Sequence, residues 1–126
     1  MNNQIMDIII YKLKTGKTIS QALKTVYTKR SIAIPFNDEM LEVPIKNLDM
    51  SPRTTNALMR AHLDTIKDVI DYKEITKVKN LGKVGIIEFF ETTLDWCWDH
   101  MNRREQAEFL LDVIDRNGCH IRAELR

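Results

Sequence analysis

The stretch ITKVKNLGKVGIIEFF, residues 75–90, decides the fold. Apolar residues recur at every third position up to Leu81, a helical spacing, and a second apolar run follows soon after Gly82. A helix, a tight glycine turn and another helix make a helix-hairpin-helix, whose glycine lets the backbone approach an anion faced by the amides of the second helix. We therefore predict a phosphate-binding hairpin at Gly82, with Lys83 adding a positive charge. An ordinary helical corner containing a glycine is the alternative.

Further helices are predicted before this hairpin. Ser51 is a good N-cap and Pro52 a good first helical residue, so a helix should run from there to about Ala61. Thr65 and Asp68 have the spacing of a capping box and predict the start of a short second helix. A third helix is expected from about residue 73 to residue 79. Together with the helix after Gly82, these elements make a pair of helix-hairpin-helix units.

The sequence after Gly82 predicts the longest helix of the chain. Its inward face is marked by apolar residues at helical spacing, namely Ile86, Phe90, Leu94, Cys97 and Met101. Asn102 and Glu105, three residues apart, predict the start of a last helix, which we expect to end at Asn117 and Gly118.

Two short helices are predicted near the N-terminus. One covers residues 5–14 and is ended by Gly16. The other starts at Thr18 or Ser20, either of which can cap it, and includes Val26.

A small β-hairpin is predicted between these helices and the main helical region. Residues 31–36 and 40–45 favour β structure and flank the turn residues 37–39. The predicted fold class is therefore mostly α: a compact helical bundle with two helix-hairpin-helix units, preceded by short helices and the hairpin and followed by a helical C-terminal extension.

Three regions are expected along the chain. Residues 1–45 form a basic arm with the hairpin, residues 46–101 the helix-hairpin-helix module, and residues 102–126 a C-terminal helix and tail. The first 34 residues carry six basic side chains against one acidic one, an asymmetry suited either to phosphates or to a solvated helix face. We expect residues 1–45 to pack on the module, because the apolar residues of the hairpin have no other surface to cover.

Three segments of the module together resemble a known family. They are LDMSPRTTNALMRA at 48–61, LDTIKDVI at 63–70 and KNLGK at 79–83. In order and spacing they resemble the C-terminal domain of the bacterial RNA polymerase alpha subunit, over about residues 46–94. The resemblance implies a double helix-hairpin-helix that reads A·T-rich double-stranded DNA in the minor groove and contacts RNA polymerase or transcription regulators.

Residue by residue, the resemblance implies a set of DNA contacts. Arg53 matches the arginine that enters the minor groove, and Asn56 an asparagine one helical turn later. Gly82 matches the hairpin glycine whose amide meets phosphate, Lys83 the first basic residue after it, and Glu88 an acidic position on the next helix. Arg53 also lies in the first turn of its helix, where a cation is unfavourable for the helix dipole, which suggests a use other than stability. A tolerated surface arginine is the alternative.

Three positions depart from the family pattern. Val84 replaces a second lysine, Gly85 replaces a serine that contacts the DNA backbone, and Ala57 replaces a frequent cysteine. We keep Gly85 among the predicted nucleic-acid-binding residues, with a weaker phosphate grip. The predicted function is a non-enzymatic, transcription-related DNA-binding protein of a bacterium, phage or mobile element. The alternative is an adaptor that binds polymerase or a regulator with little DNA binding.

Cysteine and histidine residues raise the question of a metal site. Cys97, His100, Cys119 and His120 are possible zinc ligands, but adjacent residues 119 and 120 are awkward for one tetrahedral ion and Cys97 falls on an apolar face. We predict no metal and no cofactor, and free thiols in a reducing cytoplasm.

The remaining signals concern the aromatic residues and the class of protein. Trp96, Trp98 and Phe89 form either a partner-binding patch or part of the core, and the core is favoured.

Hydrophobic residues make up 44% and charged residues 29% of the chain, the balance of a soluble globular protein with no membrane partner. No nucleophile elbow, P-loop or metalloprotease motif occurs, so we do not expect an enzyme. The sequence does not indicate an oligomeric state.

Overall fold

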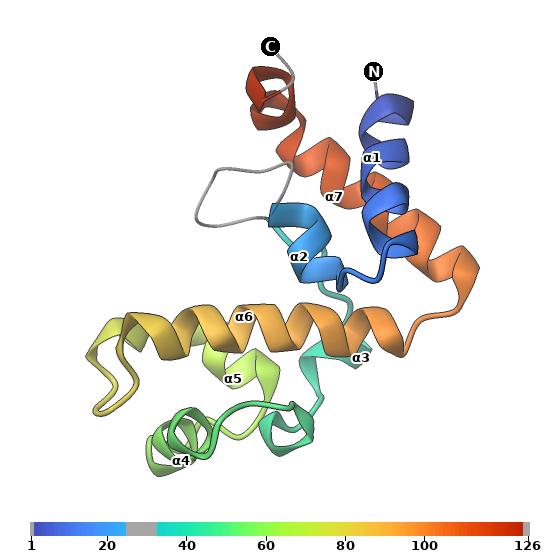
Figure 1. The fold of residues 1–126 in the computed structure, drawn as a ribbon. Coiled ribbons are helices and arrows are strands. Elements are labelled where there is room, and N and C mark those ends of the chain that lie inside the picture. Colours follow the sequence, from blue (N-terminus) through green and yellow to red (C-terminus); the bar gives the residue numbers. More distant parts are fainter. Residues whose placement is uncertain (1, 25–32, 125–126) are drawn as a thin grey trace. The chain divides into compact units, whose positions relative to one another are not determined.

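Most of the described residues lie in helices (Figure 1). The structure, a computed structural model, describes residues 2–24 and 33–124, with side chains for residues 5–24 and 33–117. It divides into two compact units, one made of residues 1–35 and 98–126 and the other of residues 36–97. The helices in chain order are α1 (Asn2–Lys14), α2 (Ile19–Lys24), α3 (Asp38–Leu41), the 3₁₀ turn η1 (Ile45–Asn47), α4 (Pro52–Arg60), α5 (Ile66–Asp71), the 3₁₀ turn η2 (Ile75–Lys77), α6 (Gly82–Asp99) and α7 (Arg103–Glu124).

The first unit is built on α1, which packs against both α2 and α7. The buried hydrophobic side chains of these helices are Ile5, Ile9, Ile19, Ala22, Leu23, Phe109, Leu110, Val113 and Ile114. Gly16, with a φ of 93°, ends α1 as predicted. Thr18 and Gln21 exchange side-chain-to-backbone hydrogen bonds of 2.9 and 3.3 Å that start α2. The predicted helical position of Val26 lies outside the described residues.

Asn117 lies inside α7 and does not end it, so the predicted end of this helix is wrong. Its side chain is only 2% exposed and makes three hydrogen bonds. The amide nitrogen donates to the carbonyl of Val113 at 2.8 Å and to that of Ala33 at 3.1 Å, while the amide oxygen accepts from the Ala33 N–H at 3.0 Å. Asn117 is therefore a buried crosslink between α7 and the backbone at Ala33. At 22 residues, α7 is longer than α6, which has 18 and was predicted to be the longest.

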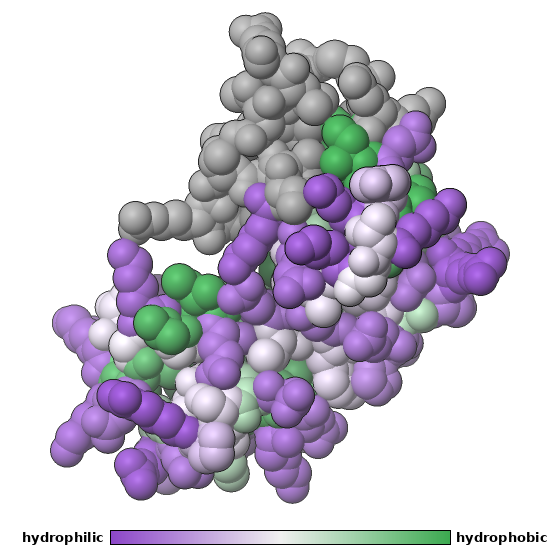
Figure 2. Space-filling view, in the orientation of Figure 1, coloured by the Kyte–Doolittle hydropathy of each residue, from purple (hydrophilic) through white to green (hydrophobic). Residues whose placement is uncertain are grey.

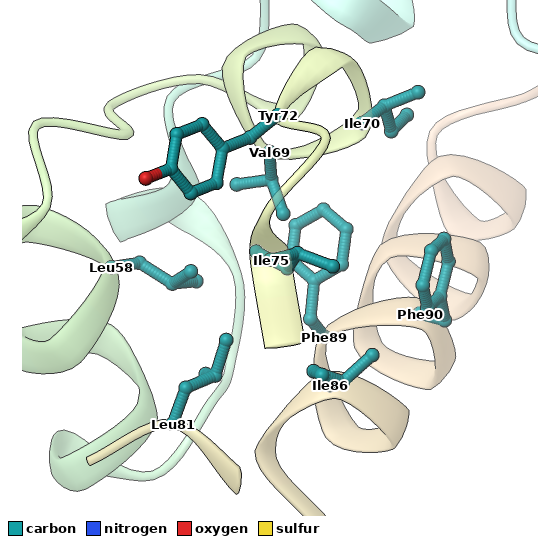
Figure 3. A pocket seen from close by; sticks show the side chains of 9 residues that line it. All are labelled: Leu58, Val69, Ile70, Tyr72, Ile75, Leu81, Ile86, Phe89 and Phe90. Carbon is teal, nitrogen blue, oxygen red and sulfur yellow. The ribbon is translucent and has the colours of Figure 1, made fainter. Parts of the chain in front are cut away.

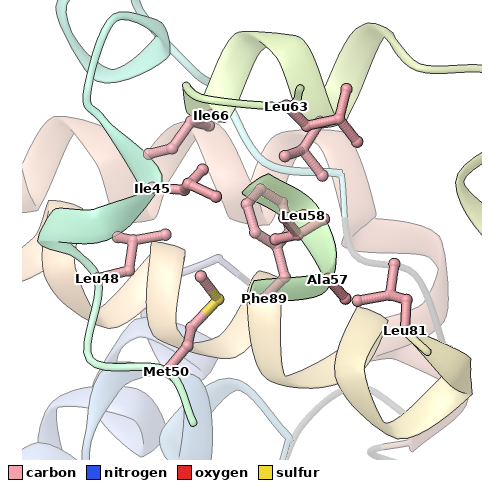
Figure 4. Close-up of a cluster of buried hydrophobic side chains, with 10 residues drawn as sticks. Ile45, Leu48, Met50, Ala57, Leu58, Leu63, Ile66, Leu81 and Phe89 are labelled. Atoms are coloured by element: carbon pink, nitrogen blue, oxygen red, sulfur yellow. The ribbon is translucent and has the colours of Figure 1, made fainter. Parts of the chain in front are cut away.

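The second unit surrounds one apolar cluster (Figure 4). Phe89 of α6 is 1% exposed and lies in this cluster with Leu58 of α4. Ile75 of η2 is partly buried and packs against the cluster. The buried members of the cluster are Ile45, Leu48, Met50, Ala57, Leu58, Leu63, Ile66, Val69, Leu81 and Phe89. In Figure 1, α4 and α5 lie on the same side of α6. The cluster thus fixes the two helix-hairpin-helix units around the start of α6.

The predicted helix starts are confirmed wherever a side-chain cap defines them. Ser51 accepts from the Thr54 amide before Pro52 opens α4, and Thr65 with Asp68 forms a complete capping box on α5. Asn102 accepts from the Glu105 amide at 2.8 Å and starts α7. A cap is made by residues at most three apart, so the sequence alone specifies it.

The predicted β-hairpin is wrong: α3 occupies residues 38–41, and the described residues contain no strand. Asn37, expected in a turn, instead caps α3 by accepting from the Met40 amide at 2.8 Å. The extended residues around Pro44 pair elsewhere, in a single antiparallel bridge with Thr65. Ser31 and Ile32, the start of the predicted first strand, lie outside the described residues.

Two further predictions within this unit are corrected. The helix expected over residues 73–79 shrinks to the single 3₁₀ turn η2. The inward face of α6 is also shifted, because Phe89 is buried whereas Phe90, predicted inward, is 42% exposed. Residues 86–90 are apolar on several sides of the helix except at Glu88, so spacing alone did not select between the two phenylalanines.

Candidate nucleic-acid interface

Helix α4 presents Arg53 and Asn56 to solvent. Both side chains are exposed, whereas Thr54, Ala57 and Leu58 on the other side of the helix are buried. Residues three apart lie on the same helix face, one turn above the other. The burial pattern of α4 therefore sets Arg53 in the first turn and Asn56 directly behind it on one polar surface.

Glu88 of α6 holds the start of α4 in place. Its carboxylate accepts hydrogen bonds from the Ser51 amide at 3.1 Å and from the Ser51 hydroxyl at 3.0 Å. Hydrogen bonding from Thr54, and then from the Ser51 amide and hydroxyl, outweighs partial burial and lowers the pKa of Glu88 below its ordinary value of 4.5. Glu88, which the sequence predicts as a nucleic-acid contact, thus binds the N-terminal end of the helix that carries Arg53.

Gly85 lies in the first turn of α6, close to Thr54 of α4. It is buried, and a Cβ there would lie 2.9 Å from Leu81 Cδ1 and 3.3 Å from Thr54 Oγ1. The absence of a side chain lets the first turn of α6 approach the first turn of α4. The structure therefore gives Gly85 a packing role and brings the hairpin before α6 next to the helix that carries Arg53 and Asn56.

The hairpin itself has an unusual backbone at two positions. Asn80 and Gly82 have φ angles of 68° and 64°, and Leu81 between them is buried. Gly82 is exposed, and a Cβ added to it would meet nothing within 4 Å. Gly82 is needed for its backbone angle, and the space beside it is open to an approaching ligand. Lys83 is exposed next to it.

His62 is a feature that the sequence analysis missed. It is exposed with a φ of 61° at the turn between α4 and α5, and the Leu63 amide then donates to the Leu58 carbonyl at 3.0 Å. Both hairpins of the unit therefore turn through a left-handed residue. The available signal was the short interval between the predicted end of one helix at Ala61 and the cap Thr65, which leaves room only for a tight turn.

The second unit also carries apolar side chains at its surface. A hollow of about 90 Å³ is lined by Leu58, Val69, Ile70, Tyr72, Ile75, Leu81, Ile86, Phe89 and Phe90 (Figure 3). Val84, the position of the missing lysine, is 82% exposed, and Ile87 one turn later is 46% exposed. On the face drawn in Figure 2, hydrophobic side chains lie scattered among hydrophilic ones over the described part of the surface.

The three aromatic rings lie against other side chains, in line with the favoured interpretation that they belong to the core. Phe89 is buried in the apolar cluster, Trp96 packs partly buried against that cluster, and Trp98 makes an edge-to-face contact with Phe109 at 6.1 Å between ring centres. Each ring contributes to packing.

Among the described residues, no three His, Cys, Asp or Glu side chains come together in a way that could hold a metal ion. Burial raises the pKa of the Cys97 thiol to about 11. The side chains of Cys119 and His120 lie outside the described part. None of the described helices is both long and apolar enough to cross a membrane.

One segment of the chain is similar to known proteins. Residues 35–91 match the family described as the C-terminal domain of the alpha chain of bacterial RNA polymerase. Relatives are DNA-directed RNA polymerase alpha subunits: that of Thermosynechococcus vestitus is 32% identical over 68 residues, 52% of this chain, and that of Desulforudis audaxviator 42% identical over 53 residues, 40% of this chain. The Herpetosiphon aurantiacus subunit is 28% identical over 103 residues, 66% of this chain.

These matches cover only part of the relatives. The aligned stretches span 21%, 17% and 31% of the lengths of the three subunits. No solved structure matches the chain significantly. The family match covers residues 35–91, which lie almost wholly within the second compact unit, residues 36–97.

Proposed function

We propose that the protein is a non-enzymatic, transcription-related DNA-binding protein of the cytoplasm. The proposal starts from the match between residues 35–91 and the family of bacterial RNA polymerase alpha C-terminal domains. The observation that carries the proposal is the juxtaposition of two features in one unit. Arg53 and Asn56 lie exposed on α4, and the first turn of that helix packs against the first turn of α6, directly after the open hairpin at Gly82.

The two features suit two parts of a DNA duplex. A narrow minor groove over A·T-rich sequence concentrates negative potential and attracts an inserted arginine, which is the role we assign to Arg53, with Asn56 supporting it. The hairpin at Gly82 suits the phosphate backbone, because its left-handed glycine leaves the amides at the start of α6 accessible and Lys83 adds a charge. Groove contacts specify sequence and phosphate contacts fix position.

Glu88 and Gly85 act on this interface through position. Glu88 binds the Ser51 amide and hydroxyl and so fixes the first turn that carries Arg53. Gly85 permits the close approach of α6 to Thr54. Neither residue needs to touch DNA in order to affect binding.

Binding should be modest and dependent on salt. Val84 is 82% exposed where the family has a lysine, so this unit neutralises few phosphates. We expect about three to five phosphate contacts, each contributing roughly 0.9 to the slope of log affinity against log salt concentration.

Substitution of Arg53 tests the proposal. Arg53→Ala should weaken binding to an A·T-rich duplex by about 1 to 3 kcal/mol and reduce the preference over a G·C-rich duplex of equal length. Arg60→Ala is the matched control, because Arg60 is an exposed arginine at the other end of α4. Fluorescence anisotropy measures affinity, and circular dichroism checks that α4 stays folded. If Arg53→Ala binds both duplexes as tightly as the control, minor-groove readout by Arg53 is wrong.

A second candidate function is an adaptor that binds polymerase or a regulator. The observation that favours it is the exposure of Val84, Ile87 and Phe90 on α6, which gives this unit apolar surface beside the hairpin. An adaptor would show a flat response of DNA binding to salt and would lose its protein partner on Ile87→Asp.

A further inference from the structure

The corner between α1 and α2 in the first unit concentrates positive charge. Residues 2–24 carry four lysines, Lys12, Lys14, Lys17 and Lys24, against the single acid Asp7. All four lysines fall between residues 12 and 24, and all except the half-buried Lys12 are exposed. Within the described part of the chain, Lys14 and Lys17 form no ion pair.

Arginines elsewhere in the same unit are arranged differently. On α7, Arg104 pairs with Glu108 at 3.3 Å and Arg116 with Asp112 at 3.2 Å, each one helical turn apart. Those pairs are the ordinary arrangement of a solvated helix face. The α1–α2 corner lacks acidic residues at such spacings, so its charge is directed outward.

The corner is held by backbone contacts. The amide of Lys17 donates to the carbonyl of Lys12 at 3.1 Å, and the Thr15 hydroxyl donates to the same carbonyl at 2.8 Å. Gly16 supplies the left-handed angle that the turn requires, and the bonds between Thr18 and Gln21 fix the start of α2. The backbone that carries Lys14 and Lys17 is therefore ordered before any ligand binds, which lowers the entropy cost of binding.

Helix stability explains this charge only in part. Lys12 and Lys14 lie in the last turn of α1, where cations interact favourably with the helix dipole. Lys17 lies outside both helices and gains nothing from that effect. Tyr11, at 64% exposed, also keeps a large aromatic ring in solvent beside these lysines.

We propose that the α1–α2 corner, residues 11–24, is a second DNA-binding surface that contacts the phosphate backbone of duplex DNA through Lys14 and Lys17, with Tyr11 as a further hydrogen-bonding contact. The inference rests on the proposed function, since the second unit supplies the reason to choose DNA among polyanions. An anionic membrane is disfavoured, because the apolar side of α1 is already buried, with Ile5 2% and Ile9 0% exposed.

A second contact on the same chain changes binding by the whole protein. Once one unit is bound, the other meets DNA at a high effective concentration, so two weak contacts give much tighter binding than either alone. This corner adds phosphate contacts that do not distinguish sequences, and it compensates for the lysine absent at Val84.

The test compares two double substitutions with equal change of charge in the full chain. Lys14→Gln/Lys17→Gln removes the proposed contacts, and Arg104→Gln/Arg116→Gln, on α7 of the same unit, is the control. Each is titrated against A·T-rich and G·C-rich duplexes at several salt concentrations, with melting temperatures measured in parallel. We expect the lysine variant to reduce the log–log salt slope by about 1.8 on both duplexes, at roughly 0.9 per lost phosphate contact, and the control to leave it near the wild-type value.

The outcomes separate this inference from the proposed function. If Arg53→Ala removes the A·T preference while the lysine variant and the control have equal slopes, the second surface is wrong and the first stands. If the lysine variant lowers the slope but no A·T preference exists, the second surface stands and minor-groove readout is wrong. Loss of binding to phosphatidylserine vesicles in the lysine variant, without loss of DNA binding, would assign the corner to membranes and overturn the inference. A wild-type protein that binds neither duplex overturns both.

Discussion

Substitutions of Gly82 can distinguish two effects, strain in the backbone and obstruction of an approaching phosphate. Its φ of 64° lies in the left-handed region, and a Cβ would meet no heavy atom within 4 Å. Gly82→Ala therefore disturbs no packing, and its cost is the left-handed conformation itself, about 1 to 2 kcal/mol. Asn tolerates this region better, so Gly82→Asn should cost less, whereas Gly82→Val should cost at least as much as Gly82→Ala because β-branched residues are outliers there.

Urea denaturation measures these costs. With a slope of about 1 to 3 kcal/mol per molar urea for a small protein, Gly82→Ala should lower the midpoint by roughly 0.3 to 2 M. Gly16→Ala is a matched control, because Gly16 also has a positive φ, 93°, and open space, but lies in the first unit. Among folded variants, Gly82→Val should weaken DNA binding equally on A·T-rich and G·C-rich duplexes, while Gly16→Ala should not weaken it through this hairpin. Full stability of Gly82→Ala would refute the strain argument, and unchanged affinity of Gly82→Val would refute phosphate approach.

Three other predictions concern stability. Because the pKa of Glu88 is lowered in the folded protein, its contribution is present above about pH 4.5 and is lost as the pH falls through the lowered value; Glu88→Gln should therefore flatten part of the acid side of a stability–pH curve measured by urea denaturation. Thr93 is 0% exposed and its hydroxyl has no hydrogen-bond partner, so Thr93→Val should raise stability by about 1 kcal/mol, and a loss of that size in calorimetry would contradict this account. Residues 46–126 alone should melt below the full chain, because α7 then loses the α1 surface that packs on it; an equal melting temperature would be evidence against any stabilising role of the N-terminal residues.

Local signals in the sequence predicted more of the structure than long-range ones. The starts of α4, α5 and α7 follow from Ser51, Thr65 and Asn102, because each cap is completed by residues within one helical turn. Arg53 and Asn56, which the resemblance puts one helical turn apart, lie exposed on α4, where Ala57 and Leu58 mark the buried side.

Errors arose where a residue's partner is distant in sequence. Asn117 looks like a helix terminator, but its hydrogen bonds to Ala33, 84 residues away, let it lie buried within α7. The contact of Glu88 with the start of α4 was missed because its partner Ser51 is 37 residues away, while its contact with DNA stays a prediction. The role of Gly85 depends in the same way on Thr54 of another helix. Spacing along the chain carries no information about such pairs.

The bridge between Pro44 and Thr65 has a consequence for association between molecules. Ile45 donates to the Asp64 carbonyl at 2.9 Å and Ile66 to the Val43 carbonyl at 3.0 Å, yet the pairing stops there. It stops because the remaining amides are occupied: that of Val43 donates to Met40, and that of Asp64 to the Asp68 carboxylate at 3.1 Å. The capping box of α5 thus also closes what would otherwise be a template for strand addition. Loss of the Asp68 carboxylate would leave backbone donors open beside an extended, β-branched stretch, the kind of edge from which aggregation begins.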